Sequence, residues 1–391
     1  MKVLCVFGQY QYGNEKRGLG TEYGAFVPAL ERLGHDVLLF DSWHQQKWTS
    51  HAALNEALLD LARRARPALM LFVPYLYEVW IETLDAIRAE GIPVACWTTD
   101  DSWKYDQSSR FLAPHVDAIA TTYASVVPKY HADRIEHVIL SQWAASSAAL
   151  AEPLPAANCR YPISFVGTAN AERRKRVEEL AQRGVAVECF GHGWPRGAVA
   201  AEEIPRIIRG SVISLNFATS YGENQIKART FEVPGAGGFL LTDPAADLER
   251  FYRIGEEIEV YRDLDELAAK AKHYLADSAA RDRIARAGHE RTRREHTYEQ
   301  RLTELIDFAL QRKNLQAIEL PAFDEAMARH TTPLPMRAIR SLMLGAASLV
   351  WGRERGYAAA RRLVYEISWR LAGAKTYRAS GWPGRMYPRY F

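Results

Sequence analysis

One stretch decides the fold of this chain, namely Lys227-Ala-Arg-Thr-Phe-Glu-Val-Pro-Gly-Ala-Gly-Gly-Phe-Leu-Leu-Thr-Asp243. Its first part predicts a helix that carries Lys227, Arg229 and Glu232, because the glycine pair after it can adopt the left-handed backbone that ends a helix. A buried strand, 239–241, should follow at once. The pattern is typical of an α/β domain.

This helix could bind two parts of one ligand. Its first turn and the loop 220–224 before it offer backbone N–H groups and a positive dipole end to phosphate. Lys227 and Arg229 add positive charge, and Glu232 could accept hydrogen bonds from sugar hydroxyls. A nucleotide sugar has both a diphosphate and a ribose. The alternative is a surface helix on which Arg229 and Glu232 form an i,i+3 ion pair worth about 0.3 kcal/mol.

Length and composition restrict the class of protein. With 391 residues the chain is too long for one ordinary core, which predicts two domains. No signal peptide and no run of eighteen apolar residues is visible, so we expect a cytoplasmic protein, or a peripheral one at the inner face of the membrane. The four cysteines lack metal-type spacing and are expected to be buried in a reducing compartment.

Strand and helix patterns alternate through the first half, which predicts a parallel, doubly wound sheet. Apolar runs predict strands at 3–7, 36–40, 68–73, 93–97, 118–121 and 138–140. Helices are expected between them at 22–33, 52–64 and 79–90. Ligands of such sheets bind at the carboxyl ends of the strands, so the loops there are the candidate sites.

Three of these loops carry aromatic or acidic side chains. The loop 8–20 has four glycines but no dinucleotide fingerprint, which disfavours a Rossmann oxidoreductase. The loop 74–78 could stack on a sugar face, or it could form a hydrophobic lid over the sheet. With the third loop, 98–105, they supply the expected acceptor-binding residues: Tyr10, Tyr12, Tyr75, Tyr77 and Trp103.

The third loop also contains paired carboxylates, Asp100 and Asp101. Like charges held close together raise one pKa, so the pair could bind an acceptor hydroxyl or act as a general base. The alternative is that one of them caps a helix. We take both as candidate catalytic residues.

A second α/β pattern follows a Pro- and Ala-rich linker, 149–160. The loop after a strand ending at 166 contains Gly167 and Thr168, and the helix after it begins with basic residues. Of these Arg173 is the phosphate candidate, while a solvated basic face is the alternative. The loop Gly191-His-Gly-Trp194 follows the next strand, and its glycines would let backbone approach a flat ring closely.

The segment 227–243, together with 252–255, 259–267 and 295–298, resembles the C-terminal domain of CgeB-like (spore maturation type) glycosyltransferases of the GT-B superfamily. The resemblance is dense over 160–305, weaker over 1–150, and does not cover the last eighty or so residues. It implies two Rossmann-like domains facing a central cleft: an acceptor domain 1–148, a donor domain 161–312 and a basic helical extension 313–391. It also implies that Glu232, with glycine five residues later, contacts the donor ribose.

Within that family a second acidic residue lies eight positions before this glutamate, where the present chain has Asn224 with Glu223 beside it. The departure leaves the contact to the donor sugar open. The donor-binding residues are then expected to be Gly167, Thr168, Arg173, Gly191, His192, Gly193, Trp194, Tyr221, Gly222, Glu223, Asn224, Lys227, Arg229 and Glu232.

The expected function is a hexosyltransferase that moves a sugar from a nucleoside diphosphate to a glycan, lipid-linked or protein acceptor. Lys227 and Arg229 would stabilise the departing diphosphate, so neither a metal nor a cofactor is expected. Retention of configuration is implied by the resemblance alone. A nucleotide-sugar epimerase and a non-catalytic glycan-binding or assembly factor on the same fold are the alternatives.

The C-terminal tail differs in charge from the rest of the chain. Residues 336–391 contain eleven Lys or Arg and two Glu, a net charge of +9, against +3 for the whole chain. Two amphipathic helices are expected at 336–351 and 357–371. Such a tail suits an anionic membrane surface or a basic patch that packs on the protein, whereas nucleic acid is not expected because no such motif accompanies the charge.

Overall fold

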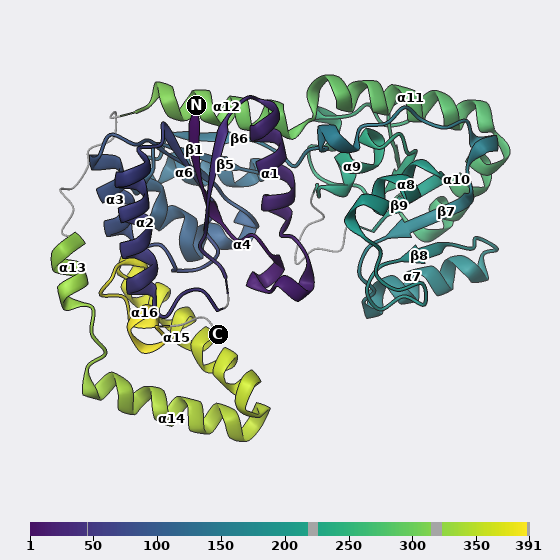
Figure 1. Ribbon diagram of the computed structural model, residues 1–391. Helices are drawn as coiled ribbons and strands as arrows, with labels where there is room; N and C mark the ends of the chain where they lie inside the picture. Colours follow the sequence, from purple (N-terminus) through teal and green to yellow (C-terminus); the bar gives the residue numbers. More distant parts are fainter. Residues whose placement is uncertain (45, 218–225, 314–322, 389–391) are drawn as a thin grey trace. The chain divides into compact units, whose positions relative to one another are not determined.

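The computed structural model describes residues 1–44, 46–217, 226–313 and 323–388. The chain divides into two compact units, residues 1–141 with 302–391 and residues 142–301. Each unit is a parallel β-sheet with helices packed around it (Figure 1). The second boundary between the units falls inside α12 (Tyr298–Gln311).

The first unit has six parallel strands in the order β2-β1-β3-β4-β5-β6. They are β1 (Lys2–Phe7), β2 (Asp36–Asp41), β3 (Leu69–Phe72), β4 (Val94–Trp97), β5 (Ala118–Thr121) and β6 (Val138–Leu140). Helices connect them: α1 (Thr21–Arg32), α2 (His51–Ala65), α3 (Ile81–Ala89), α4 (Asp101–Lys104), α5 (Arg110–Leu112) and α6 (Val127–Ala132). Because β3, β4 and β5 are buried along their whole length, they appear in the sequence as continuous apolar runs.

The second unit has five parallel strands in the order β11-β10-β9-β7-β8. They are β7 (Tyr161–Val166), β8 (Glu188–Phe190), β9 (Ser211–Asn216), β10 (Leu240–Thr242) and β11 (Glu259–Val260). The helices are α7 (Ala171–Gln182), α8 (Ile204–Arg209), α9 (Arg229–Gly235), α10 (Leu264–Ala276) and α11 (Ser278–Glu295). The predicted class, two α/β units with parallel sheets and a helical C-terminal part, is confirmed.

The helix α9 in the stretch 227–243 is shorter than the sequence predicts. α9 begins at Arg229, so Lys227 precedes the helix and does not lie on it. The turn after α9 needs glycine, because Gly237 has a φ of +78° and a Cβ there would lie 2.5 Å from the carbonyl oxygen of Ala151. This close approach packs the end of α9 against the chain that enters the second unit.

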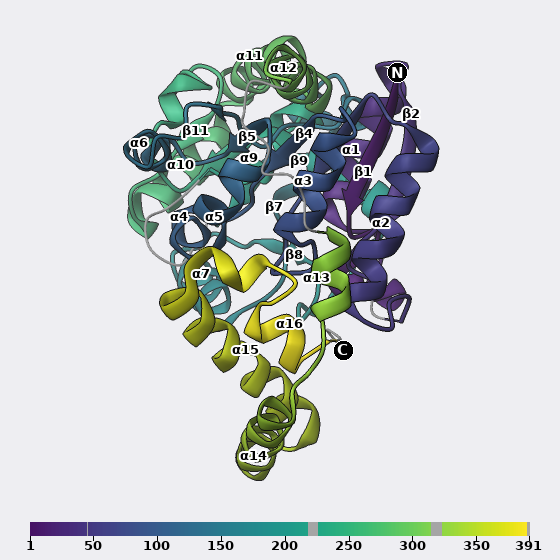
Figure 2. The same cartoon turned by 90° about the vertical axis from the view of Figure 1, so that its left-hand side faces the viewer.

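The C-terminal tail forms a hairpin of two helices, α14 (Leu334–Trp351) and α15 (Arg353–Ala372), after α13 (Phe323–Arg329). A short 3-10 helix (Gly373–Tyr377) and α16 (Trp382–Met386) end the described chain. Two views show α14 at the far edge of the first unit, away from its sheet (Figures 1 and 2).

Aromatic contacts hold α15 on the first unit. Tyr365 stacks on Tyr77 with ring centroids 5.7 Å apart. Its hydroxyl is 2.9 Å from that of Tyr377, which donates a hydrogen bond to the carbonyl oxygen of Gln107. Part of the tail therefore packs on the protein through its aromatic side chains.

Candidate functional site

Two loops at the carboxyl ends of β7 and β8 are fastened to each other. The amide of Gly167 donates to the carbonyl oxygen of Phe190 at 2.9 Å, and the amide of Ala169 donates to that of His192 at 2.8 Å. Gly191 has a φ of +125°, and a Cβ there would lie 2.4 Å from the carbonyl oxygen of Gly167. Only glycine fits at this crossing, so the loops present backbone at the edge of the sheet.

Trp194 is the last residue of the second loop, and its side chain contacts the first loop. Its side chain is buried, and its Nε1 donates to the carbonyl oxygen of Gly167 at 2.9 Å. The guanidinium of Arg174 lies over its ring, 5.3 Å from the centroid. Trp194 thus supports the loop, whereas the side chain of His192 is exposed.

Arg173 spans the ends of two neighbouring strands. Its Nη1 donates to the carbonyl oxygen of Thr168 at 2.8 Å and its Nη2 to that of Phe217 at 3.0 Å. Burial lowers the pKa of Arg173, and the nearby charges of Arg176 and Arg229 lower it further. Within the described part of the chain its buried Nε has no hydrogen-bond partner. The site therefore concentrates positive charge where β7 and β9 end.

Two other basic residues of α7, Lys175 and Arg176, form ion pairs with nearby carboxylates. Arg176 forms hydrogen bonds of 3.1 Å with both carboxylate oxygens of Asp243, the residue after β10, and a further one of 2.8 Å with Glu172. Lys175 pairs with Glu179 on the surface at 3.9 Å. Of this basic cluster, Arg173 remains the residue best placed to meet an anion.

Arg229 and Glu232 form the i,i+3 ion pair that was the alternative interpretation of α9. Arg229 Nη1 lies 2.7 Å from Glu232 Oε2, and the side chains are 21% and 37% exposed. Both therefore remain at the surface, while Phe231 and Val233 between and beside them are buried in the core. An arginine carries five N–H donors, so one carboxylate does not exhaust its capacity to bind an anion.

Four predicted donor contacts, Tyr221, Gly222, Glu223 and Asn224, lie outside the described residues. Of the remaining donor candidates, those at 167–173 and 191–194 lie along the edge formed by the ends of β7, β8 and β9, and Arg229 is near enough for its charge to act on Arg173.

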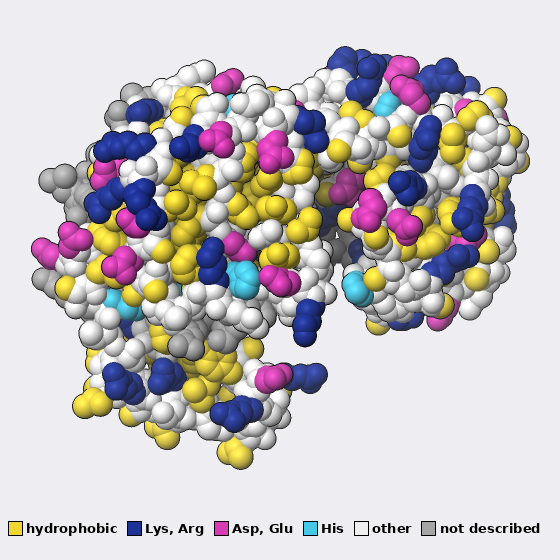
Figure 3. All heavy atoms as spheres, in the orientation of Figure 1, with side chains coloured by type: hydrophobic (Ala, Val, Ile, Leu, Met, Phe, Trp, Pro, Cys, Tyr) yellow, Lys and Arg dark blue, Asp and Glu magenta, His cyan; other side chains and the backbone are white. Residues whose placement is uncertain are grey.

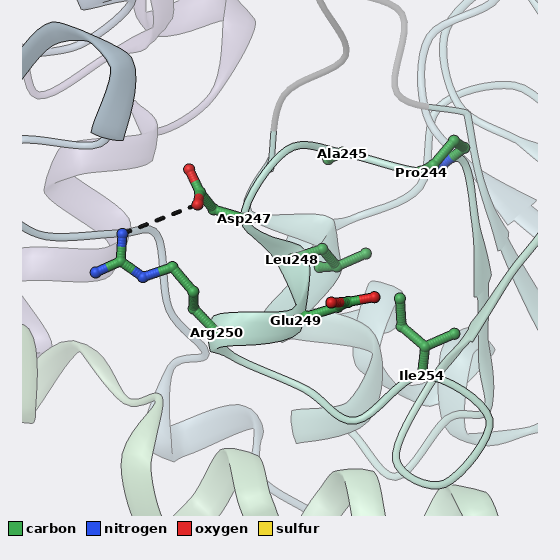
Figure 4. Close-up of a pocket in the computed structure, with 7 residues that line it drawn as sticks. All are labelled: Pro244, Ala245, Asp247, Leu248, Glu249, Arg250 and Ile254. Atoms are coloured by element: carbon green, nitrogen blue, oxygen red, sulfur yellow. Dashed lines mark ion pairs between the residues drawn. The ribbon is translucent and has the colours of Figure 1, made fainter.

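A pocket of about 350 Å³ lies elsewhere in the second unit, in the loop after β10 (Figure 4). The side chains of Leu248, Glu249 and Ile254 point to one side of it, and Asp247 and Arg250 face each other across a 3.9 Å ion pair. The described residues that line it contain two carboxylates and one guanidinium, and none is a predicted donor contact. Its charge does not favour a diphosphate.

In the first unit, Asp101 is fully buried and acts as a hydrogen-bond acceptor for three hydroxyls. Thr98 donates at 2.9 Å, Tyr130 at 2.8 Å and Ser109 at 2.5 Å. These bonds tie α4 to β4 and to α6, which favours a structural role over the predicted catalytic one. Asp100 is partly exposed, has a φ of +55° and makes no capping hydrogen bond through its side chain.

The predicted acceptor aromatics separate into buried and exposed residues. Tyr77 is buried in the core, in accord with the lid alternative. Tyr75 is partly buried and accepts a hydrogen bond from the amide of Gly8 at 3.1 Å. Tyr12 and Trp103 are exposed, and Tyr10 is partly exposed.

A polar cluster that sequence reasoning missed lies at the ends of the adjacent strands β1, β3 and β4. Lys104 Nζ donates to Thr99 Oγ1 at 3.2 Å; burial lowers the pKa of Lys104, and the carboxylates of Asp100, Glu78 and Glu22 oppose that shift. Burial also raises the pKa of Glu22, whose carboxylate lies 3.5 Å from the Tyr75 hydroxyl. The available signals were the position of Glu22 just after a glycine-rich loop and of Lys104 just after the acidic pair.

Known proteins share parts of this architecture. Residues 173–307 match a family model described as glycosyl transferase-like. No curated protein matches the chain.

Three solved structures have a similar fold. HepE from Anabaena, in complex with UDP and glucose, has a TM-score of 0.54 and 13% identity, covering 78% of this chain and 99% of its own. Sucrose-phosphate synthase from Thermosynechococcus elongatus has a TM-score of 0.55 and 12% identity, with 80% and 99% covered. The lipopolysaccharide outer core galactosyltransferase WaaB has a TM-score of 0.52 and 11% identity, with 78% and 99% covered.

At these identities the structural likeness establishes the fold. The two parallel sheets are those of the GT-B fold. Residues 173–307 are similar to the glycosyl transferase-like family model, and together with the fold this similarity supports a transferase.

Proposed function

We propose that the protein transfers a sugar from a nucleoside diphosphate to a glycan, lipid-linked or protein acceptor. One observation carries the proposal: Arg173, Arg229 and Glu232 lie at the carboxyl edge of the second sheet, within the glycosyl transferase-like domain. This edge is where open parallel sheets bind their ligands.

The charges suit a diphosphate leaving group. Arg173 and Arg229 are close enough for the charge of one to lower the pKa of the other, so an anion between them would relieve their repulsion. Guanidinium groups bind phosphate oxygens by paired, charge-assisted hydrogen bonds. As the bond to the sugar breaks, negative charge grows on the diphosphate, and fixed cations then stabilise the transition state more than the bound donor.

The remaining parts of the donor have candidate partners in the same unit. Glu232, oriented by its ion pair with Arg229, would accept hydrogen bonds from the ribose hydroxyls. The loop 191–194 would receive the base, because Gly193 is exposed and has no side chain to cover its backbone. HepE, which shares the fold, binds UDP with glucose, and this favours a nucleotide sugar as the ligand class.

For the acceptor, the proposal uses the polar cluster of the first unit. Asp100 is the remaining carboxylate candidate there for activating a hydroxyl, with Lys104 and Glu22 positioning it. Lys227, one residue before the N-cap of α9, would assist Arg229 on the diphosphate. Independence from metal and retention of configuration are part of the proposal as well.

The test is a screen of UDP-, GDP-, ADP-, dTDP- and CMP-sugars, read by thermal shift and by release of the nucleotide. We expect one diphosphate sugar to raise the melting temperature and to release its nucleoside diphosphate when acceptor is added. CMP-sugars, which lack the diphosphate, should do neither. Conversion of the donor without acceptor would indicate an epimerase, and binding without any release would indicate a non-catalytic protein.

A further inference from the structure

The outer face of α14 is apolar, and its leucines are exposed among the residues that the structure describes in this unit. Leu334, Leu342 and Leu349 are 77%, 74% and 90% exposed. Leu342 lies eight residues after Leu334, and Leu349 lies seven after Leu342, so each step is about two helical turns and the three share one side of the helix. The opposite side packs on α15 and α16 through Met336 and Ala347, among others.

α14 is therefore apolar on both of its sides. A helix that is hydrophobic all round normally has both sides covered. Figure 3 shows hydrophobic side chains projecting at the edge of the first unit where Figure 1 labels α14, with Lys and Arg side chains beside them. Ile339, Val350 and Trp351 are also at least half exposed on this helix.

The charge around this face is predominantly positive. The hairpin 334–372 contains seven arginines and two glutamates, a net charge of +5, and α14 itself contains two arginines and no acidic residue. One of the glutamates, Glu366, is already shared by Arg362 at 2.7 Å and Arg370 at 2.5 Å. Arg353 and Arg355, next to the turn of the hairpin, are exposed.

We propose that the outer face of α14 docks on an anionic membrane surface. The leucines would enter the boundary between headgroups and acyl chains, Trp351 would lie at the headgroup level, and the arginines would pair with anionic lipid. Among the described residues no helix is long and apolar enough to cross a bilayer, so α14 would lie in the plane of the surface.

A second copy of the chain suits this face less well. In a symmetric dimer the same patch meets itself, so two hairpins that each carry a net charge of +5 would come together. An anionic lipid surface complements both the apolar stripe and the charge. The inference goes beyond the proposed transferase activity and does not depend on it.

The test is co-sedimentation of the full chain with vesicles of phosphatidylcholine alone or mixed with phosphatidylglycerol. We expect binding to the anionic vesicles that is at least about tenfold tighter than to the neutral ones and that weakens as salt is added. The double variant Leu342→Glu with Leu349→Glu should lose at least about tenfold of this affinity, since it removes apolar contact and adds repulsion. Leu275→Glu, at an exposed leucine near the end of α10, is the matched control and should bind as wild type does.

Three results would overturn the proposal: absence of vesicle binding by the wild type, equal binding by the double variant, or equal binding to neutral vesicles. Analytical ultracentrifugation without lipid tests the alternative, in which a second copy of the chain binds this face. If the wild type forms a dimer that Leu349→Glu dissociates, and if it does not bind vesicles, this face is the contact with a second copy. Melting curves of the variants show whether they fold. The same curves with the nucleotide sugars of the screen added show whether donor binding is retained when vesicle binding is lost.

Discussion

Replacing Arg229 by methionine separates a functional role of the α9 ion pair from a structural one. The pair joins two partly exposed side chains at 2.7 Å. Exposed ion pairs of this kind contribute about 0 to 1 kcal/mol, so Arg229→Met should fold and melt close to wild type. Methionine keeps the length of the aliphatic stem and removes only the charged end.

The effect on donor binding should be larger. Opposite unit charges about 4 Å apart interact with about 4 kcal/mol near a protein surface, and partial exposure of Arg229 reduces this figure. A loss of about 1.4 kcal/mol, the lower end of what we expect, corresponds to about tenfold in affinity. Turnover should fall by more than affinity, because the charge on the diphosphate grows in the transition state.

The chain offers a matched control for this measurement. Arg250 also pairs with an acidic residue on its own helical turn, Asp247 at 3.9 Å, with side chains 57% and 45% exposed. Titration calorimetry with the nucleoside diphosphate, followed by turnover, should show a loss for Arg229→Met and none for Arg250→Met. Equal behaviour of the two variants would refute the assignment of Arg229 to the diphosphate.

Four further predictions concern a glycine, a buried carboxylate, a buried histidine and the independence from metal. Gly191→Ala should cost about 3 kcal/mol and abolish donor binding, because its Cβ would lie 2.4 Å from a carbonyl oxygen, whereas Gly197→Ala, with open space around it, should cost about 1 kcal/mol in a thermal melt. Asp101→Asn should destabilise by about 3 kcal/mol because it disturbs three buried hydrogen bonds, and an unchanged melting temperature would argue against a structural role. Burial lowers the pKa of His296 from 6.5 to about 4, so the unfolded chain binds more protons between these values and stability should fall by up to about 3 kcal/mol as the pH drops through that window; His296→Gln should flatten the profile. Dialysis against EDTA should leave turnover unchanged, and recovery of lost activity by added Mg²⁺ or Mn²⁺ would contradict metal independence.

The strands could be predicted because each is a short apolar run that stops at a glycine, a proline or a polar residue. β5 and β6 have the predicted bounds, and β3 and β4 lie within the predicted ranges. Parallel strands buried on both faces leave this signal in the sequence itself. Helix patterns with a clear apolar face predicted α1 and α2 to within one residue at each end.

The site residues were harder to judge because their roles depend on partners distant in the chain. Asp100 and Asp101 are neighbours in sequence, but only Asp101 is buried. It accepts a hydrogen bond from Tyr130, which is twenty-nine residues away in the chain. Tyr77 faces the core because the tail places Tyr365 against it. The charge environment of Lys104 likewise comes from three different loops and helices, which local pattern cannot reveal.

The most direct test is a crystal structure of the protein with a nucleoside diphosphate or its sugar bound. We expect the diphosphate within hydrogen-bond distance of the Arg173 and Arg229 side chains, with the ribose hydroxyls on Glu232. A nucleotide bound in the pocket between Pro244 and Ile254, or anywhere that leaves both arginines without phosphate, would contradict the proposed donor site.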